Sequence, residues 1–298
     1  EGACCGPTAG GWRLPLASRL CRGPEQLHVE PMQVSILTGI VALLAALALC
    51  SVPGGRGPGA VCACRALAAV SAVCTLAGSA CYFRAAWTPP GAFDSSCASA
   101  RARYAAALDR AASVTAEDAG RESSNWWGES APLVHQLAIV GPLRSKFCNA
   151  TRQCVPMFDH YCVFLRTPVG LDNYAAFFAT ILWSAVSCAC LASAAAIALK
   201  SAEDALRFWL LAWTAGYFAG FAVCWAGLVA YHLILARHGL TTYEMIQLDR
   251  RTPPAYLFDE SGNFANPYSR GLLRNLHARL FPEHNHGEDG LEDGEGKV

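Results

Sequence analysis

The chain has 298 residues, of which 53% are hydrophobic and only 15% are charged. A soluble domain needs far less apolar material, so the composition indicates a membrane protein. Its 23 basic and 23 acidic residues give a net charge of zero. The absence of a net positive charge argues against a nucleic-acid partner.

Four uncharged apolar runs are long enough to cross a bilayer, which takes about 18 residues or more at a rise of 1.5 Å per residue. They are residues 34–52, 66–83, 174–199 and 208–236. Short connections, 51–65 and 200–207, join them into two hairpins. The sequence therefore predicts an all-α membrane protein with four transmembrane helices.

The distribution of basic residues predicts the orientation of these helices. An even number of spans places both termini on the same side as the polar loop 84–173. Only four of the 23 Lys and Arg residues lie in the two short connections, and the other 19 lie in the termini and this loop. The positive-inside rule then makes the loop cytosolic.

The same reasoning divides the chain into six segments. We expect a cytosolic N-terminal segment (1–30), a transmembrane hairpin (31–83), the cytosolic loop (84–173), a second transmembrane hairpin (174–236), a cytosolic C-terminal domain (237–282) and an acidic, disordered tail (283–298). Residues 101–114 are rich in Ala and are expected to be helical. Nothing in the sequence resembles a cleavable signal peptide.

Most of the fifteen cysteines are expected to be reduced. Many lie in apolar runs, where Cys behaves as a small hydrophobic residue, and a cytosolic loop faces a reducing compartment. A thiol in that loop is therefore available for chemistry.

The loop contains the stretch Asp159-His160-Tyr161-Cys162, which lies 12 residues before the third apolar run and combines a nucleophile, a base and a carboxylate. An imidazole can take the proton of a neighbouring thiol, and a carboxylate can fix the tautomer of that imidazole. Each residue alone also has an ordinary interpretation, as a buried Cys, a core His or a solvated loop carboxylate. Their combination predicts an acyl-transfer site.

Further motifs surround this stretch in a fixed order. Cys154-Val155 precedes it, Val169-Gly170 and Asn173-Tyr174 follow it, and Thr241-Thr242-Tyr243-Glu244 comes after the last apolar run. In this order the motifs resemble the DHHC protein S-acyltransferases (palmitoyltransferases), in the variant with Tyr at the third motif position. The resemblance covers the four-span plan and most of residues 31–281.

The resemblance implies roles for the residues of the stretch. Cys162 attacks the thioester of acyl-CoA, His160 deprotonates Cys162, and Asp159 orients His160. A cysteine of a cytosolic or membrane-associated substrate protein then takes the long-chain acyl group, palmitoyl in the family, from Cys162. The bilayer is the other expected partner, because the acyl tail belongs among the spans.

Three more residues are expected to support the site. The resemblance implies that Thr242 bonds near the catalytic Asp159, and that Glu244 and Asn275 belong to conserved elements, the latter packing the C-terminal domain against the membrane helices. Thr241 and Glu244 also form an ordinary capping box, and an Asn-Pro pair such as Asn266-Pro267 can simply start a helix.

Four basic residues near Cys162 in the sequence are candidates for binding the phosphates of CoA. They are Arg144, Lys146, Arg152 and Arg166. Their alternative role is attraction to anionic lipid, which suits basic residues beside a membrane equally well.

The cysteine-rich region departs from the family pattern, which usually holds two zinc ions. An upstream Cys-x-x-Cys is absent, and only Cys148 and Cys154 keep ligand identities. Two thiolates do not complete a four-coordinate structural site, so we expect no metal ligands and no zinc, apart from one alternative in which His135 or Cys97 joins the two cysteines. Residues that cannot bind zinc stand at four further ligand positions of the family, Phe147, Thr151, Tyr161 and Pro168. We expect four aromatic residues to form a core in place of the metal, Phe147, Phe158, Tyr161 and Phe164.

Two other functions remain open at this stage. One is an inactive family member that binds acyl-CoA or acts as a membrane adaptor, which the lost zinc ligands favour. The other is a transporter or channel, but His232 is the one ionisable candidate in the spans apart from Tyr and Cys. The expected location is an endomembrane, either Golgi or endoplasmic reticulum, or the plasma membrane.

Overall fold

The structure is a computed structural model, and it describes residues 40–42, 44–45, 58–91, 101–102, 104–106, 133–134, 139–141, 144–251, 254–259 and 261–282. These residues fall into two compact units. The helical unit takes its residues from 40–87 and 175–232. The loop unit takes its residues from 88–174 and 233–282.

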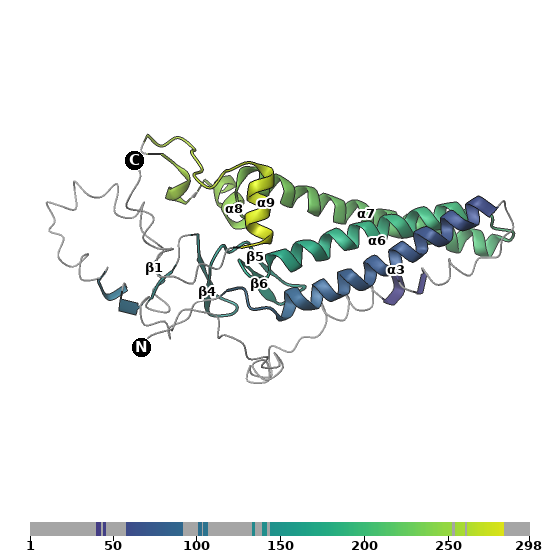
Figure 1. Cartoon of the computed structure of the whole chain (residues 1–298), viewed down its shortest axis with the longest axis horizontal. Helices are drawn as coiled ribbons and strands as arrows, with labels where there is room; N and C mark the ends of the chain where they lie inside the picture. The colour runs from purple at the N-terminus through teal and green to yellow at the C-terminus, as the bar shows by residue number, and fades with distance from the viewer. Residues whose placement is uncertain are drawn as a thin grey trace. The chain divides into compact units, whose positions relative to one another are not determined.

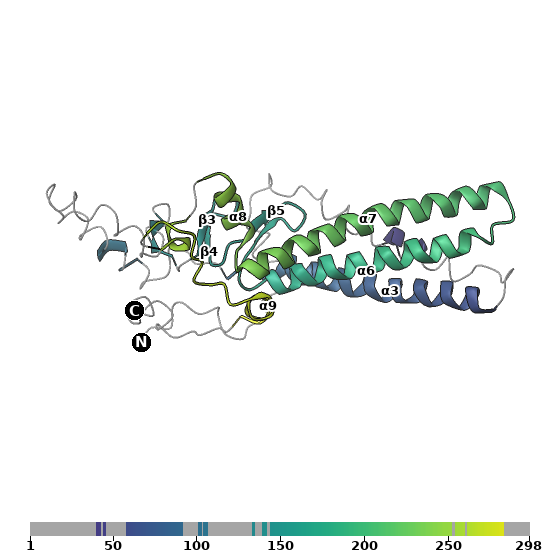
Figure 2. The ribbon, with the colours of Figure 1, turned by 90° about the horizontal axis from the view of Figure 1, so that it is seen from above.

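Three helices are long and apolar enough to cross a membrane within the described part of the chain. They are α3 (Pro58–Trp87), α6 (Tyr174–Leu199) and α7 (Ala205–His238), and they run side by side in both views (Figures 1 and 2). They contain the second, third and fourth predicted runs. Of the first run, the structure describes only residues 40–42 and 44–45, which are helical, so a fourth span stays a prediction.

The connection predicted for residues 51–65 is wrong in its second half. The helix α3 already begins at Pro58, because Pro is well suited to the first helical position, where its missing N–H is not needed. Residues 58–65 therefore belong to the helix and not to the turn.

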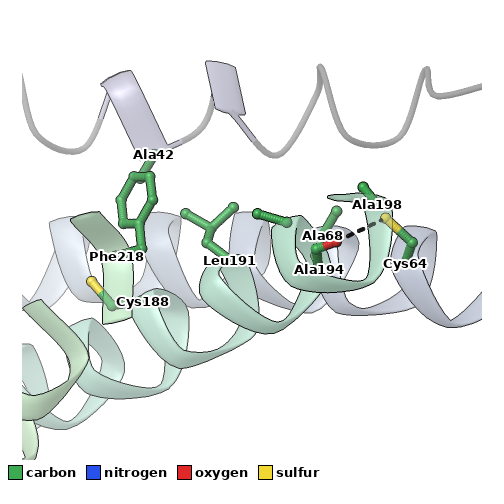
Figure 3. Close-up of a cluster of buried hydrophobic side chains, with 9 residues drawn as sticks. Ala42, Cys64, Ala68, Cys188, Leu191, Ala194, Ala198 and Phe218 are labelled. Carbon is green, nitrogen blue, oxygen red and sulfur yellow. Dashed lines mark hydrogen bonds between the residues drawn. The ribbon is translucent and has the colours of Figure 1, made fainter. Parts of the chain in front are cut away.

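The core of the helical unit is built from small side chains. Ala68, Ala194 and Ala195 are completely buried, and the thiol of Cys64 donates to the carbonyl of Ala194 at 3.5 Å (Figure 3). Small residues allow close approach of helix backbones where lipid gives no hydrophobic driving force.

Hydroxyl groups also join α3 to α6. Ser71 Oγ lies 2.8 Å from Ser187 Oγ and donates to the Ser187 carbonyl at 3.0 Å, and Thr75 Oγ1 lies 2.7 Å from the same Ser187 hydroxyl. These polar groups satisfy one another inside an apolar unit.

The loop unit contains three small β-hairpins, which the all-α prediction missed. The pairs are β1 (Leu133–Val134) with β2 (Ile139–Val140), β3 (Lys146–Cys148) with β4 (Gln153–Val155), and β5 (His160–Cys162) with β6 (Thr167–Val169), all antiparallel. Strands of two or three residues are too short to show a clear alternation in sequence.

The C-terminal part of the loop unit holds α8 (Thr242–Asp249), the short 3-10 helix η2 (Ala255–Leu257) and α9 (Leu272–Leu280). Gly239 ends α7 with a φ of 65°, which favours glycine. Its N–H donates to Ala236 and that of Leu240 to Leu235, at 3.1 and 3.0 Å, a Schellman motif that turns the chain into α8.

Several predictions concern residues outside the described part of the chain. These are the N-terminal segment 1–30, Cys97, His135, most of the predicted helix 101–114, and the acidic tail 283–298.

Candidate active site

Asp159 and His160 form a bonded pair at the start of β5. The Asp159 carboxylate is only 1% exposed, and its Oδ2 lies 2.8 Å from Nδ1 of His160. The backbone N–H of Asp159 donates to the carbonyl of Val169 on β6 at 2.9 Å. The hairpin therefore fixes the main chain from which both side chains extend.

Cys162 follows two residues after His160 on the same strand, so both side chains lie on one face of the hairpin. Cys162 is 8% exposed, and it is one of the groups that raise the pKa of His160. Burial lowers the pKa of His160, but hydrogen bonds and charge interactions with Asp159 and Cys162 outweigh burial and raise this pKa to about 9. The surroundings of His160 therefore favour its protonated form.

Thr242, the first residue of α8, holds the same carboxylate from another element. Its hydroxyl donates to Asp159 Oδ2 at 2.6 Å, and its backbone N–H donates to Oδ1 at 3.0 Å. A carboxylate with both oxygens bonded keeps its orientation, and here the N-terminus of a helix also favours its negative charge.

Asn173 closes the hairpin β5–β6 from behind. Its amide donates to the carbonyl of Pro168 at 2.9 Å and accepts from the N–H of Gly170 at 2.9 Å. Gly170 must lack a side chain, because a Cβ there would lie 2.5 Å from Val155 Cγ1 and 2.8 Å from the Pro90 carbonyl oxygen. The Val-Gly-x-x-Asn pattern thus has a local structural role.

Glu244 is buried on α8 and forms the predicted capping box with Thr241, whose N–H donates to Glu244 Oε2 at 2.8 Å. Its carboxylate also receives Arg144, with Nε–Oε1 at 2.7 Å and Nη2–Oε2 at 2.5 Å, and the hydroxyl of Tyr256 at 2.8 Å. Burial alone would raise the pKa of Glu244, but the bonds to Arg144 hold it below its usual value.

Asn275 on α9 ties the C-terminal helix to the end of α7. Its amide donates to the carbonyl of Ala236 at 2.8 Å and accepts from the N–H of Arg270 at 2.9 Å. Asn266 similarly donates to the carbonyl of His238 at 2.6 Å. Both amides satisfy carbonyls that the end of a helix leaves without intrahelical partners.

The four basic candidates for CoA binding lie in different environments. Arg144 is buried against Glu244 and lies 4.4 Å from the ring of Tyr268. Lys146 lies 3.7 Å from the ring of Tyr243, and burial lowers its pKa. Arg152 is exposed and Arg166 is half-buried. Arg144 thus forms an internal ion pair with Glu244. Its position near Cys162 in the sequence did not predict this pair.

The described residues do not fit a zinc ion. Cys148 and Cys154 both lie in the β3–β4 hairpin, where the Cys154 thiol donates to Ser145 Oγ at 3.3 Å and burial raises its pKa. A cysteine binds zinc as a thiolate. No group of three or more His, Cys, Asp or Glu side chains in the described ranges is arranged to hold a metal.

The expected aromatic core forms only in part. Phe158 is 7% exposed and packs with Cys148, Val155 and Tyr243, and the ring of Phe147 is half-buried with Arg152 5.4 Å from its centre. Two others are exposed, Tyr161 at 38% and Phe164 at 57%, so including them in this core was wrong. Tyr161 alternates with His160 and Cys162 along β5, and it therefore faces away from them.

The sequence analysis missed Arg279, and it named Tyr174 as part of a motif without giving it a role at the site. Arg279 on α9 lies 3.5 Å from Asp159 Oδ1, and it donates to the hydroxyl of Tyr174 at 3.1 Å. Arg279 is four residues after Asn275 and shares its face of α9. That spacing was the available signal, but nothing in the sequence shows that this face meets Asp159.

A buried carboxylate, an imidazole and a thiol in this order have the chemistry expected of a cysteine nucleophile with a base and an orienting group. Comparison with known proteins agrees with that class. Residues 133–249 match the family model of the DHHC palmitoyltransferases, and this match, with the relatives below, supports that family.

The relatives are named for the same activity. The chain is 28% identical over 149 residues to a probable protein S-acyltransferase, number 15, of Arabidopsis thaliana, covering 47% of this chain and 57% of that protein. It is 37% identical over 105 residues to palmitoyltransferase SWF1 of Eremothecium gossypii, covering 35% and 31%. For palmitoyltransferase pfa3 of Aspergillus fumigatus the identity is 27% over 156 residues, covering 49% and 26%. The chain thus spans little more than half, or less, of these relatives.

Proposed function

We propose that this chain is a protein-cysteine S-acyltransferase that moves a long-chain acyl group, such as palmitoyl, from acyl-CoA to Cys162 and then to cysteines of substrate proteins. One observation carries the proposal: Asp159 and His160 are bonded at 2.8 Å, with Cys162 two residues after His160 on the same strand, inside the segment that matches the DHHC palmitoyltransferases.

In the first half-reaction the proton of the Cys162 thiol passes to His160, and the thiolate attacks the carbonyl carbon of the acyl-CoA thioester. The carbon–sulfur bond to CoA breaks, and the CoA thiolate takes the proton from His160. The pKa of about 9 for His160 keeps the imidazole protonated at neutral pH until the CoA thiolate takes this proton. The product is an S-acyl Cys162.

In the second half-reaction the neutral His160 takes the proton of a substrate thiol. That sulfur attacks the acyl carbon, the bond to Cys162 breaks, and His160 returns the proton to Cys162. Asp159 keeps the same contact with His160 through both steps and stabilises the imidazolium each time it forms.

The membrane setting completes the proposal. Burying an acyl tail is worth roughly 0.8 kcal/mol per methylene, which favours placing the tail among the apolar helices and the CoA head group in the cytosol. We propose four spans, with the loop and both termini cytosolic, in a Golgi, endoplasmic reticulum or plasma membrane. The partners are then the bilayer and cytosolic or membrane-associated substrate proteins.

Among the four basic candidates, Lys146, Arg152 and Arg166 remain proposed contacts for CoA phosphates. Arg144 has a different proposed role, because its two bonds to Glu244 stabilise α8, the helix that presents Thr242 to Asp159. We also propose that no zinc is needed, since Cys154 is held as a hydrogen-bonded thiol.

A second candidate function is an inactive membrane adaptor or acyl-CoA-binding protein, which the incomplete zinc ligand set favours. A chase experiment separates the two. Purified protein is loaded with radiolabelled palmitoyl-CoA, freed from excess donor, and mixed with a peptide that contains one cysteine. The enzyme transfers label from the chain to the peptide through a hydroxylamine-sensitive bond. An adaptor retains acyl-CoA without a covalent chain intermediate, and that outcome would overturn the proposal.

A further inference from the structure

Arg279 brings a buried positive charge from the C-terminal helix α9 to the carboxylate of Asp159. Its side chain is 8% exposed, and Nη2 lies 3.5 Å from Asp159 Oδ1. The two residues are 120 positions apart in the sequence. A contact between buried opposite charges is far stronger than the same contact in water, so it acts on the carboxylate even at this distance.

Tyr174 fixes the direction of the guanidinium. Its hydroxyl accepts from Arg279 Nη1 at 3.1 Å, and the Cζ atom of Arg279 lies 4.7 Å from the centre of its ring. An arginine held by a hydrogen bond and by a ring face has little freedom to turn. Its other nitrogen is therefore held toward Asp159.

The contacts divide the carboxylate into two sides. Oδ2 faces His160 Nδ1 at 2.8 Å and the Thr242 hydroxyl at 2.6 Å. Oδ1 faces the Thr242 N–H at 3.0 Å and Arg279 at 3.5 Å. Holding Oδ1 from α8 and α9 together prevents the carboxylate from rotating, and it keeps Oδ2 directed at the imidazole.

The charge of Arg279 has a second consequence. The charged and titratable groups around the Asp159–His160 pair include Cys162, Arg279 and Tyr174. The carboxylate and the thiolate both favour the protonated imidazole, whereas the positive charge of Arg279 offsets part of the carboxylate field. We expect this opposing charge to limit how strongly His160 holds its proton.

We propose that Arg279 is a positioning residue for the acyl transfer proposed above: by holding Asp159 from α9 it orients His160 and sets the pH range in which His160 can exchange its proton. This inference rests on the proposed function for its rate effect. Its effect on the protonation of His160 is independent of acyl transfer and can be measured separately.

The test compares variants of the full chain in detergent or bilayers. Arg279→Met removes the charge. Arg279→Gln also removes the charge but keeps amide donors, and it is used in place of Arg279→Met if that variant unfolds. Arg279→Lys keeps the charge without the planar fork, and Tyr174→Phe keeps the charge but removes the hydroxyl. Arg274→Met is the matched control, because Arg274 is an exposed arginine of the same helix.

Two readouts are taken from neutral to alkaline pH. The first is the rate of acylation of Cys162 by palmitoyl-CoA. The second is carbethoxylation of His160 by diethyl pyrocarbonate, which reacts with the uncharged imidazole, quantified on the His160 peptide by mass spectrometry. The second readout needs no acyl transfer.

Loss of the charge should lower the neutral-pH rate by about 10- to 100-fold and move the titration of His160 upward by about one pH unit. Arg279→Lys and Tyr174→Phe should lower the rate with the titration unmoved, and Arg274→Met should match wild type. A titration of His160 that stays in place in both uncharged variants would overturn the proposal, whatever happens to the rate.

The two proposals fail in different ways. A wild-type chain that is never acylated would contradict the acyltransferase function, whereas the carbethoxylation profile would still decide the role of Arg279. An upward shift there supports Arg279 as the group that positions the Asp159–His160 pair, and an unchanged profile contradicts it.

Discussion

Two neighbouring hairpins of the loop unit have equal strand lengths but are held in different ways. The hairpin β3–β4 carries Cys148 and Cys154 and is held by packing, with Cys148 and Val155 against Phe158. The hairpin β5–β6 carries His160 and Cys162 and is held by polar bonds to α8 through Asp159.

The resemblance to the family implies lost zinc-ligand positions in both hairpins, at Phe147 in one and at Tyr161 and Pro168 in the other, so the hairpins differ in which side chains must be kept. In β3–β4 apolar contacts and internal hydrogen bonds can replace a metal, because the ligands only cross-link the chain. In β5–β6 the side chains themselves carry the proposed chemistry, so replacement by packing would remove the function. The predictions below test that division, from the largest expected effect to the smallest.

His160→Ala in β5 should have the largest effect among these variants. Removal of a general base typically costs about 100- to 10,000-fold, so acylation of Cys162 at pH 7 should nearly disappear. The rate of label incorporation from palmitoyl-CoA measures it, with His277→Ala on an exposed part of α9 as the matched control. Wild-type activity in His160→Ala would mean that the thiol is activated by another group.

Glu244→Gln should lower the stability of the folded protein, because Glu244 forms the contacts that support α8. Breaking one side of a buried ion pair costs about 3–5 kcal/mol, because Arg144 stays buried without its partner charge. Thermal unfolding in detergent measures this loss, and Glu203→Gln at an exposed site is the control. An unchanged melting temperature would show that the pair contributes little.

The same pair makes a pH prediction. The pKa of Glu244 is lower in the folded state than in the unfolded state. The ionised carboxylate therefore stabilises the fold above the unfolded-state pKa, and this stabilisation is lost as the pH falls through the folded-state pKa. Wild type should lose stability on acidification more steeply than Glu244→Gln. Parallel curves for the two proteins would contradict this assignment.

Phe158→Leu tests the packing of β3–β4 and should have a smaller effect. The substitution removes the edge contact to Tyr243, with ring centres 5.9 Å apart, and the Lys146 contact at 5.2 Å. Loss of such contacts is worth about 1 kcal/mol. Leu273→Ala, at a site 80% exposed, should leave the unfolding temperature unchanged, and equal effects in both variants would argue against this core.

Metal chelators should have almost no effect on the activity or the melting temperature of the protein. A structural zinc contributes about 10–16 kcal/mol of apparent binding free energy, so its removal would be obvious in both activity and melting temperature. We expect neither to change in wild type after treatment with a strong chelator. Metal analysis that finds one or two tightly held zinc ions per chain would refute the packing account of β3–β4.

The long apolar elements could be predicted from the sequence, because composition and length alone define a candidate span. The second, third and fourth runs lie within α3, α6 and α7. The capping box at Thr241 was also predictable, since both of its partners lie within one helical turn.

The remaining contacts of the site depend on tertiary structure. Arg144 and Glu244 are 100 positions apart, and Arg279 and Asp159 are 120 apart. Local pattern assigned Arg144 to phosphate binding because it lies near Cys162 in the chain. Long-range pairing of this kind leaves no periodic signal, and it is the fold that decides which carboxylate each arginine meets.

The central claim is tested most directly by locating the acyl group on the purified protein. Wild type and Cys162→Ala are incubated with palmitoyl-CoA, treated with or without hydroxylamine, digested and analysed by mass spectrometry. The account predicts a hydroxylamine-sensitive acyl group on the Cys162 peptide of wild type and rapid labelling that disappears in Cys162→Ala. Labelling of Cys162→Ala at the wild-type rate, or an acyl group found on wild type only at other cysteines, would contradict it.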